Sequence, residues 1–299
     1  MNNFIVRMTT GLIGAAIIIT GLFWSNLFYL GLTSAVLVGG LWEFFGMFEQ
    51  SRKADGKLFF RYKYIITGAA VFMHVFSFLL NFRYSYADFA VFFPALIFIV
   101  FILELYSKAE KPFENLSWTI LGLIYLLMPM LLLNKLYFEH GKLLVMSLIF
   151  MTWFYDSFCY IFGSLLGRTK LFERVSPKKT WEGLAGGLIL TLALGYFYLP
   201  FLEFVSASLP SFNLLVPHFT QTQWLFLTAV VILGATYGDL VESLLKRSVG
   251  VKDSGSAIPG HGGFLDRLDA LLIGIPFLVL AIWFVDQWNS ILLLINYLK

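Results

Sequence analysis

The sequence is a succession of apolar stretches, most of them about 20 residues long, separated by short polar breaks. A transmembrane helix needs roughly 20 mainly apolar residues to cross the hydrocarbon core of a bilayer. Charged residues make up 13% of the chain, about half of the ~25% that is usual in a soluble domain. We therefore expect an all-α, polytopic integral membrane protein.

Apolar length predicts about nine spans. They lie at about 9–24, 27–48, 64–82, 88–106, 115–136, 142–167, 183–203, 224–245 and 268–286. No internal repeat stands out, so an inverted-repeat transporter gains no support from the sequence. The single cysteine, Cys159, excludes an intramolecular disulfide and argues against a cysteine-based metal site.

Lys and Arg are distributed unevenly over the loops between these spans, and cytoplasmic loops normally carry the excess. The loops that share one side of a nine-span chain are rich in basic residues, whereas the opposite side receives only Arg83, Lys135, Lys142 and Lys299. This asymmetry predicts a cytoplasmic N-terminus. It also places the two most polar segments, 168–182 and 246–267, on the cytoplasmic side.

The N-terminal and C-terminal parts of the chain are expected to have different roles. Residues 1–137, with about five spans, are expected to form scaffold, dimer-forming or lipid-facing helices. Residues 138–299, with about four spans and the two polar loops, are expected to carry the chemistry. The formal net charge of +3 is too small to suggest a nucleic-acid partner.

Ionisable residues recur at helical spacing at the end of the eighth predicted span. One polar face of this helix carries Asp239, Glu242 or Ser243, and Lys246 or Arg247. An ionisable group inside a span is costly unless it faces a cavity, a partner or an ion. Lys246 and Arg247 alone could be anchors at the membrane surface, but anchoring does not explain the two acidic residues deeper in the span.

A glycine-rich polar segment, KDSGSAIPGHGGFLDRLDA, precedes the last span. Asp266 and Asp269 are three residues apart, so both carboxylates point to one face of a helix. Converging carboxylates near Lys252 suit Mg²⁺, usually with substrate phosphates completing its coordination. The glycine turn exposes backbone N–H groups to an anionic ligand. Its candidate phosphate contacts are His261, Gly262 and Gly263, and for the histidine we favour this role over that of a general base.

The segment SPKKTWEG contains the third cluster. Lys178 and Lys179 lie between Ser176 and Thr180, just before a helix, an arrangement that suits an anionic ligand. As a lone pair, the two lysines would more simply be anchors to lipid headgroups. Asp156, in the preceding span, is compatible with an interhelical hydrogen bond and with lining a site.

The run SLLKRSVGVKDSGSAIPGHGGFLDRLD, from Ser243 to Asp269, closely resembles the signature of phosphatidate cytidylyltransferases, also called CDP-diacylglycerol synthases. The segments DSFCYIFGSLLGRTKL…SPKKTWEG and GDLVES resemble further parts of that family. Together these segments cover about the second half of the chain. The resemblance implies that phosphatidic acid attacks the α-phosphorus of CTP, giving CDP-diacylglycerol and pyrophosphate.

The resemblance also implies roles for individual residues. Catalytic roles are expected for Asp239, Lys252, Asp266 and Arg267. Mg²⁺, with a second cation left open, is expected to bind among Asp239, Glu242, Asp266 and Asp269. Substrate contacts are expected from Asp156, Ser176, Lys178, Lys179, Thr180, Ser243, Lys246, Arg247, His261, Gly262 and Gly263.

The expected partners are CTP, phosphatidic acid and membrane lipid, with no nucleic acid and with a homodimer left open. The short N-terminus resembles bacterial members of the family, so we expect a bacterial cytoplasmic membrane with the active site on its cytoplasmic side. The alternative is a transporter or proton-coupled carrier, which would also place carboxylates in membrane helices. Against this alternative, all polar clusters lie at one end of the predicted spans.

Overall fold

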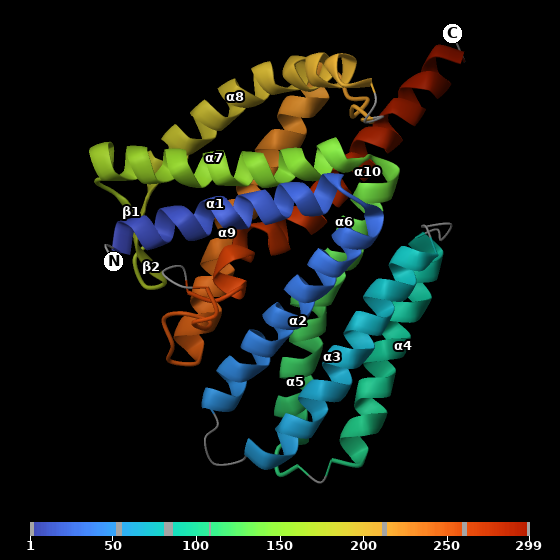
Figure 1. Ribbon diagram of the computed structural model, residues 1–299, viewed down its shortest axis with the longest axis vertical. Helices are drawn as coiled ribbons and strands as arrows, with labels where there is room; N and C mark the ends of the chain where they lie inside the picture. Colours follow the sequence, from blue (N-terminus) through green and yellow to red (C-terminus); the bar gives the residue numbers. More distant parts are fainter. Residues whose placement is uncertain are drawn as a thin grey trace. The chain divides into compact units, whose positions relative to one another are not determined.

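The computed structural model describes residues 3–51, 56–80, 86–107, 109–210, 214–258 and 262–297. These residues are mostly helical (Figure 1), which confirms the all-α prediction. The helices are α1 (Asn3–Phe23), α2 (Asn26–Ser51), α3 (Gly56–Leu79), α4 (Tyr86–Leu105), α5 (Pro112–Gly122), α6 (Met128–Glu139), α7 (Lys142–Leu166), α8 (Trp181–Ser208), α9 (Gln221–Ser248) and α10 (Asp269–Tyr297).

Several of these helices can cross a membrane. Six described segments are both long and apolar enough: Asn26–Gln50, Pro112–Glu139, Lys142–Leu166, Trp181–Ser208, Gln221–Ser248 and Asp269–Ile291. Three shorter apolar helical segments coincide with the other predicted spans: Met8–Phe23, Lys63–Leu79 and Phe92–Leu105. The class of membrane protein is therefore confirmed, while the count of nine spans and their orientation stay predictions.

The span at Pro112–Glu139 consists of α5, a short π-helical segment η1 (Leu123–Leu127) and α6. Pro129 explains the irregularity, because proline has no N–H to donate to the carbonyl four residues earlier. The helix adjusts by a wider turn, in which the N–H of Met128 donates to the carbonyl of Leu123. The span thus continues without a break.

The chain forms two compact units. Unit 1 contains Met1–Phe138 and Leu244–Leu268, and unit 2 contains Glu139–Ser243 and Asp269–Lys299. Helix α9 therefore contributes its last residues to unit 1 and the rest to unit 2. The predicted division of roles between residues 1–137 and 138–299 stays a prediction.

A buried polar cluster joins three helices of unit 1. His74 on α3 is 0% exposed, with Nε2 2.9 Å from Thr33 Oγ1 and Nδ1 3.2 Å from Asn134 Nδ2. Because the amide nitrogen of Asn134 is a donor, Nδ1 must accept, and the N–H of Nε2 donates to Thr33. The Thr33 hydroxyl in turn donates to the carbonyl of Tyr29 at 2.9 Å. A neutral histidine therefore links α2, α3 and α6.

Replacing His74 by Leu is expected to lower the free energy of unfolding by about 1–3 kcal/mol, because it leaves a buried donor of Asn134 without its acceptor. The control is Ser77→Ala on the same helix. Ser77 Oγ is buried and has no hydrogen-bond partner within the described residues, so its loss should change stability little. Denaturant titration in detergent measures both variants, and equal stability of His74→Leu and the wild type contradicts the role of the cluster.

In unit 2, a small core joins α7, α9 and α10. It consists of Tyr155, Ile232, Ala235 and Ala270, with Cys159 packed against it. The hydroxyls of Tyr155 and Thr236 are 2.5 Å apart, which links α7 to α9 by a hydrogen bond. This core fixes the helix ends that carry Asp239 and Asp269.

An antiparallel hairpin follows α7, where the sequence predicted only a polar loop. Its strands are β1 (Lys170–Phe172) and β2 (Ser176–Thr180), with Lys170 opposite Thr180. Figure 1 shows the hairpin between the end of α7 and the beginning of α8. The hairpin gives a defined conformation to the segment that carries the paired lysines.

Candidate active site

The polar segments form two networks, one in each unit. The loop network belongs to unit 1 and consists of Glu43, Lys246, Asp266 and the residues of the glycine-rich segment that they contact, Ser254, Gly263, Phe264 and Leu265. The helix network belongs to unit 2 and consists of Lys179, Asp239 and Ser243. Both networks have members on α9.

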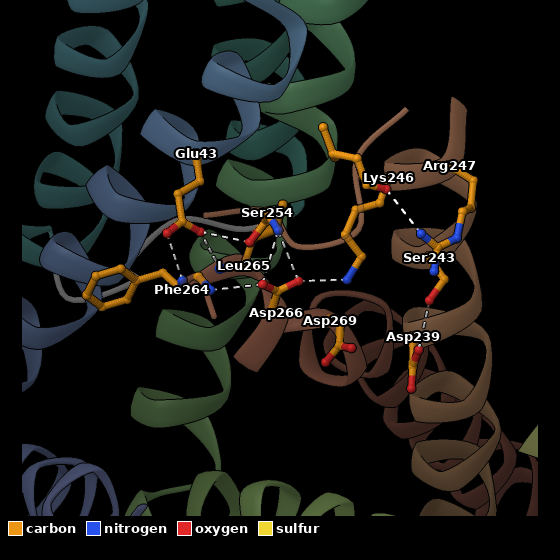
Figure 2. A network of polar contacts seen from close by, with 12 residues as sticks. Glu43, Asp239, Ser243, Lys246, Arg247, Ser254, Phe264, Leu265, Asp266 and Asp269 are labelled. Atoms are coloured by element: carbon orange, nitrogen blue, oxygen red, sulfur yellow. Dashed lines mark hydrogen bonds and ion pairs between the residues drawn. The ribbon is translucent and has the colours of Figure 1, made fainter. Parts of the chain in front are cut away.

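Asp266 lies at the centre of the loop network, in the short 3-10 helix η3 (Leu265–Arg267). Its side chain is 7% exposed, and Oδ1 forms an ion pair with Lys246 Nζ at 2.6 Å. Oδ2 accepts from the backbone N–H of Gly263 at 2.8 Å and of Ser254 at 3.1 Å. Figure 2 shows these contacts converging on the one carboxylate. Asp266 therefore holds both ends of the glycine-rich segment to α9.

Two opposing effects act on the Asp266 carboxyl. Burial raises its pKa, whereas the hydrogen bond and the charge of Lys246 and the N–H groups of Gly263 and Ser254 lower it. The lowering effects prevail, so the pKa of Asp266 lies below its usual value. The carboxylate is thus ionised throughout the neutral range.

This shift predicts a dependence of stability on pH. A carboxyl group whose pKa is lowered by folding stabilises the folded state above its unfolded pKa of about 3.9, and this contribution is lost as the pH falls through the folded pKa. The difference in free energy of unfolding between the wild type and Asp266→Asn should therefore be constant from about pH 6 to 8 and shrink in acid. Urea titrations across this range measure it, and a difference that grows in acid contradicts the predicted sign.

Glu43, on α2, is a member of the loop network that the sequence reasoning missed. Glu43 is 9% exposed, and its carboxylate accepts from the N–H of Phe264 at 3.0 Å and of Leu265 at 2.9 Å. It also accepts from the Ser254 hydroxyl at 3.0 Å. The sequence does contain a signal for this residue, because Glu43 is an acidic residue in the apolar run GGLWEFFGMF. An ionisable group inside a span is costly unless it has a partner, and this holds for Glu43 as it does for Asp239.

The glycine turn is shaped by close packing around these carboxylates. Gly262 has φ = 86°, in the region that favours glycine, and its carbonyl accepts from the N–H of Ile258 at 2.8 Å. A Cβ atom at Gly263 would collide with the Ser254 hydroxyl and the Glu43 carboxylate. The N–H of Gly263 donates to Asp266. The predicted contact of Gly263 with substrate stays a prediction. His261 lies outside the described residues.

The helix network brings together two of the predicted clusters. Asp239 on α9 forms an ion pair with Lys179 on β2, with Oδ2 and Nζ 2.7 Å apart. Its Oδ1 accepts from the Ser243 hydroxyl at 3.2 Å, one helical turn further on. The side chains of Lys179 and Asp239 are 28% and 33% exposed, respectively. The pair is therefore accessible to a charged ligand.

Local hydrogen bonds fix the position of Lys179. Thr180 is the N-cap of α8, and its hydroxyl accepts from the N–H of Gly183 at 3.2 Å. Glu182, in the first turn of α8, accepts from the N–H of Arg168 at 3.0 Å and of Thr169 at 3.1 Å. The hairpin is thereby tied to the helix at both of its ends. The structure gives Thr180 this capping contact, while its predicted contact with substrate stays a prediction.

Asp269 lies next to the helix network in the same unit. Its Oδ1 accepts from the N–H of Ala270 at 2.8 Å, at the beginning of α10. A Cβ atom at Gly238 would collide with the carbonyl oxygen of Asp269 and lie 3.1 Å from Ala270 Cα. The backbone of α9 directly before Asp239 therefore contacts the start of α10 at Asp269.

The remaining predicted site residues differ in exposure. Glu242 is 1% exposed. Ser176 is partly buried at the start of β2. Arg247 Nη1 donates to the carbonyl of Val251 at 3.2 Å. The predicted site residues with exposed side chains are Asp156, Lys178, Arg247, Lys252 and Arg267.

The carboxylates of these networks are candidate ligands of Mg²⁺. Among the described residues, no group of three or more His, Cys, Asp and Glu side chains converges on one point. Mg²⁺ is usually held by only one or two protein carboxylates, with water and substrate phosphates. Asp239 and Asp269, on two helices in contact, fit that requirement, but Asp239 does so only if Lys179 leaves Oδ2, because the two are 2.7 Å apart. Asp266 fits it only if Lys246 leaves Oδ1, because the two are 2.6 Å apart.

The fold and the two networks define a helical membrane protein with lysine–carboxylate pairs in its polar segments. The family model described as "Cytidylyltransferase family" matches residues 5–285. The chain belongs to this cytidylyltransferase family.

Curated relatives carry the name phosphatidate cytidylyltransferase. The protein from Haemophilus influenzae is 40% identical over 146 residues, which cover 49% of this chain and 48% of the relative. The Thermotoga maritima protein is 34% identical over 179 residues, or 60% and 63% of the two chains. The Staphylococcus saprophyticus protein is 34% identical over 186 residues, or 62% and 65%. The matched region thus spans about half to two thirds of these relatives' lengths, and the resemblance seen in the signature is confirmed.

Proposed function

We propose that this protein transfers the cytidylyl group of CTP to phosphatidic acid, forming CDP-diacylglycerol and pyrophosphate. Membership of the cytidylyltransferase family supports the class of reaction, and the names of the curated relatives support the substrates. The structural observation that carries the proposal is the Lys179–Asp239 pair, at 2.7 Å. It joins two separate signature segments into one partly exposed set of charges.

In the proposed reaction, an oxygen of the phosphatidate phosphate forms a bond to the α-phosphorus of CTP. The bond from the α-phosphorus to the bridging oxygen breaks, and pyrophosphate leaves with that electron pair. The phosphatidate itself is the nucleophile, so no covalent intermediate with the protein is needed. Such transfers depend mainly on positioning and on stabilisation of negative charge.

The lysines of both networks supply positive charge for this reaction. Lys179 and Lys246 each pair with a carboxylate in the structure. We propose that an incoming phosphate takes the place of the carboxylate as the partner of the lysine. Further contacts to the phosphates are proposed for the exposed side chains of Lys178, Arg247, Lys252 and Arg267, and for the Ser243 hydroxyl.

We propose Mg²⁺ as the cofactor, held by Asp239 and Asp269, with Asp266 and Glu242 as further candidate ligands. When bound, Mg²⁺ supplies charge neutralisation for the phosphates of CTP. Release of Lys246 from Asp266 would make that carboxylate available as well. A second cation, a bacterial cytoplasmic membrane and a site on its cytoplasmic side belong to the same proposal, the last supported by the distribution of Lys and Arg.

The test is pyrophosphate release by purified protein in detergent–lipid micelles that contain CTP, phosphatidic acid and Mg²⁺. Release that stops when any one of the three is omitted supports the proposal. Release without phosphatidic acid would instead indicate hydrolysis of CTP. Absence of release from folded protein, tested with several acyl chains and metals, contradicts the proposal.

A further inference from the structure

We infer that Glu43 is a positioning residue of the active site: its carboxylate holds the glycine-rich segment, through the described residues Ser254, Phe264 and Leu265, in the position that places Asp266. The inference rests on the proposed function only for its effect on activity. It assigns a role in the site to the N-terminal part of the chain, for which the sequence predicted a scaffold. Every contact that carries it lies inside unit 1.

The first observation is that both oxygens of the Glu43 carboxylate accept hydrogen bonds. Oε1 accepts from the N–H of Phe264, and Oε2 accepts from the N–H of Leu265 and the Ser254 hydroxyl. The two N–H groups lie at the start of η3, where a helix has donors without internal acceptors. Glu43 therefore acts as a cap that is supplied by another helix.

The second observation is that the same segment holds Asp266. The N–H groups of Ser254 and Gly263 donate to Asp266, while Ser254 Oγ and the N–H groups that follow Gly263 donate to Glu43. Ser254 thus contacts both carboxylates, one through its backbone and one through its side chain. Figure 2 shows Glu43 and Asp266 on either side of the Ser254 and Leu265 contacts. Movement of the segment away from Glu43 would displace the donors that fix Asp266.

The chemistry of the contact requires a carboxylate. An amide has only one acceptor oxygen, so Glu43→Gln can keep the contacts of one oxygen alone. If its oxygen replaces Oε2, its NH₂ group faces the N–H of Phe264, and two donors meet. Burial makes the mismatch costly, since Glu43 is only 9% exposed. The change preserves side-chain size, so its effect is directed at the segment rather than at helix packing.

Hydrogen exchange of the full-length protein in detergent tests the placement without reference to activity. Peptides covering 254–266 should exchange at least about tenfold faster in Glu43→Gln than in the wild type, with the rest of unit 1 unchanged. The matched control is Glu49→Gln, on the same helix, where Glu49 pairs with Lys63 at 3.5 Å. This control should leave exchange in 254–266 as in the wild type.

Two results of this measurement would overturn the inference. One is unchanged exchange in 254–266, and the other is faster exchange throughout unit 1, which would make Glu43 a general stabilising residue. If Glu43→Gln does not fold, Ser254→Ala provides the same test. It removes one donor to Glu43 and keeps the backbone N–H that binds Asp266, so a smaller but local acceleration is expected, and none would contradict the inference.

The activity of the same variants links the placement to the reaction. Glu43→Gln should lower kcat/KM for CTP by about 10–100-fold through misplacement of Asp266, and Glu43→Asp should recover part of the loss because it restores two acceptor oxygens. Local loosening with wild-type kcat/KM overturns the positioning role. A wild-type protein that releases no pyrophosphate, yet shows the local loosening in Glu43→Gln, contradicts the proposed function and leaves the structural role of Glu43 standing.

Discussion

Asp266→Asn is expected to lower kcat for pyrophosphate release by at least about 100-fold, within the range for loss of one electrostatic group in an active site. The protein should remain folded and inserted in the membrane. Asn keeps the size of the side chain but removes the charge that pairs with Lys246 at 2.6 Å. Its amide has only one acceptor oxygen, so its NH₂ group must face another donor, either Lys246 Nζ or the N–H groups of Ser254 and Gly263.

The effect of Asp266→Asn can be separated from a general loss of charge on the chain. Asp286→Asn, at an exposed position on α10, makes the same chemical change at a residue that belongs to neither network and should retain full activity. Initial rates at saturating CTP and phosphatidic acid compare the two variants. Normal activity of Asp266→Asn would refute a role for this carboxylate in the reaction, whether through metal or through the glycine-rich segment.

Asp239→Asn is expected to give the second large loss of activity, also about 100-fold in kcat. It should also raise the Mg²⁺ concentration that is needed for half-maximal activity. Lys179→Ala removes the other member of this ion pair and should raise the KM for CTP about tenfold. Because the two side chains are 2.7 Å apart, their effects should not add in the double variant. Rates measured across a series of CTP and Mg²⁺ concentrations resolve these effects.

The control for Lys179 is Lys170→Ala, an exposed position on the same hairpin. It also removes a positive charge near the start of α8, but the proposed site does not include it, so the KM for CTP should stay as in the wild type. Equal effects of the two lysine changes would indicate a general electrostatic contribution of the hairpin. If Lys179→Ala changes only membrane orientation, Lys179 is an anchor and not a substrate contact.

The membrane helices could be predicted because apolar length is a local property of the chain. The six long spans and three shorter apolar helices therefore coincide with predicted ranges. The hairpin at Lys170–Thr180 could not be predicted in this way, because its strands have only three and five residues. The segment is also held by the hydrogen bonds of Glu182 and Thr180 to neighbouring N–H groups. The spacing of apolar residues along the chain indicates little about such hydrogen bonds.

The candidate site was predictable in its residues but not in its pairings. The sequence singled out Lys246, Asp266, Lys179 and Asp239 without indicating which lysine meets which carboxylate. Glu43 illustrates the reason, because 211 residues separate it from Ser254. A contact over that separation follows from tertiary packing alone, and the sequence offers only the hint of an acid within an apolar span.

Transfer of label from CTP to lipid tests the central claim most directly. Purified protein with phosphatidic acid and Mg²⁺ receives CTP that carries radioactive phosphorus at the α position in one reaction and at the γ position in another. The proposed attack on the α-phosphorus predicts that the α label enters the lipid fraction as CDP-diacylglycerol, while the γ label leaves as pyrophosphate. Label from the γ position in the lipid, or no lipid label while CTP is consumed, would contradict this account.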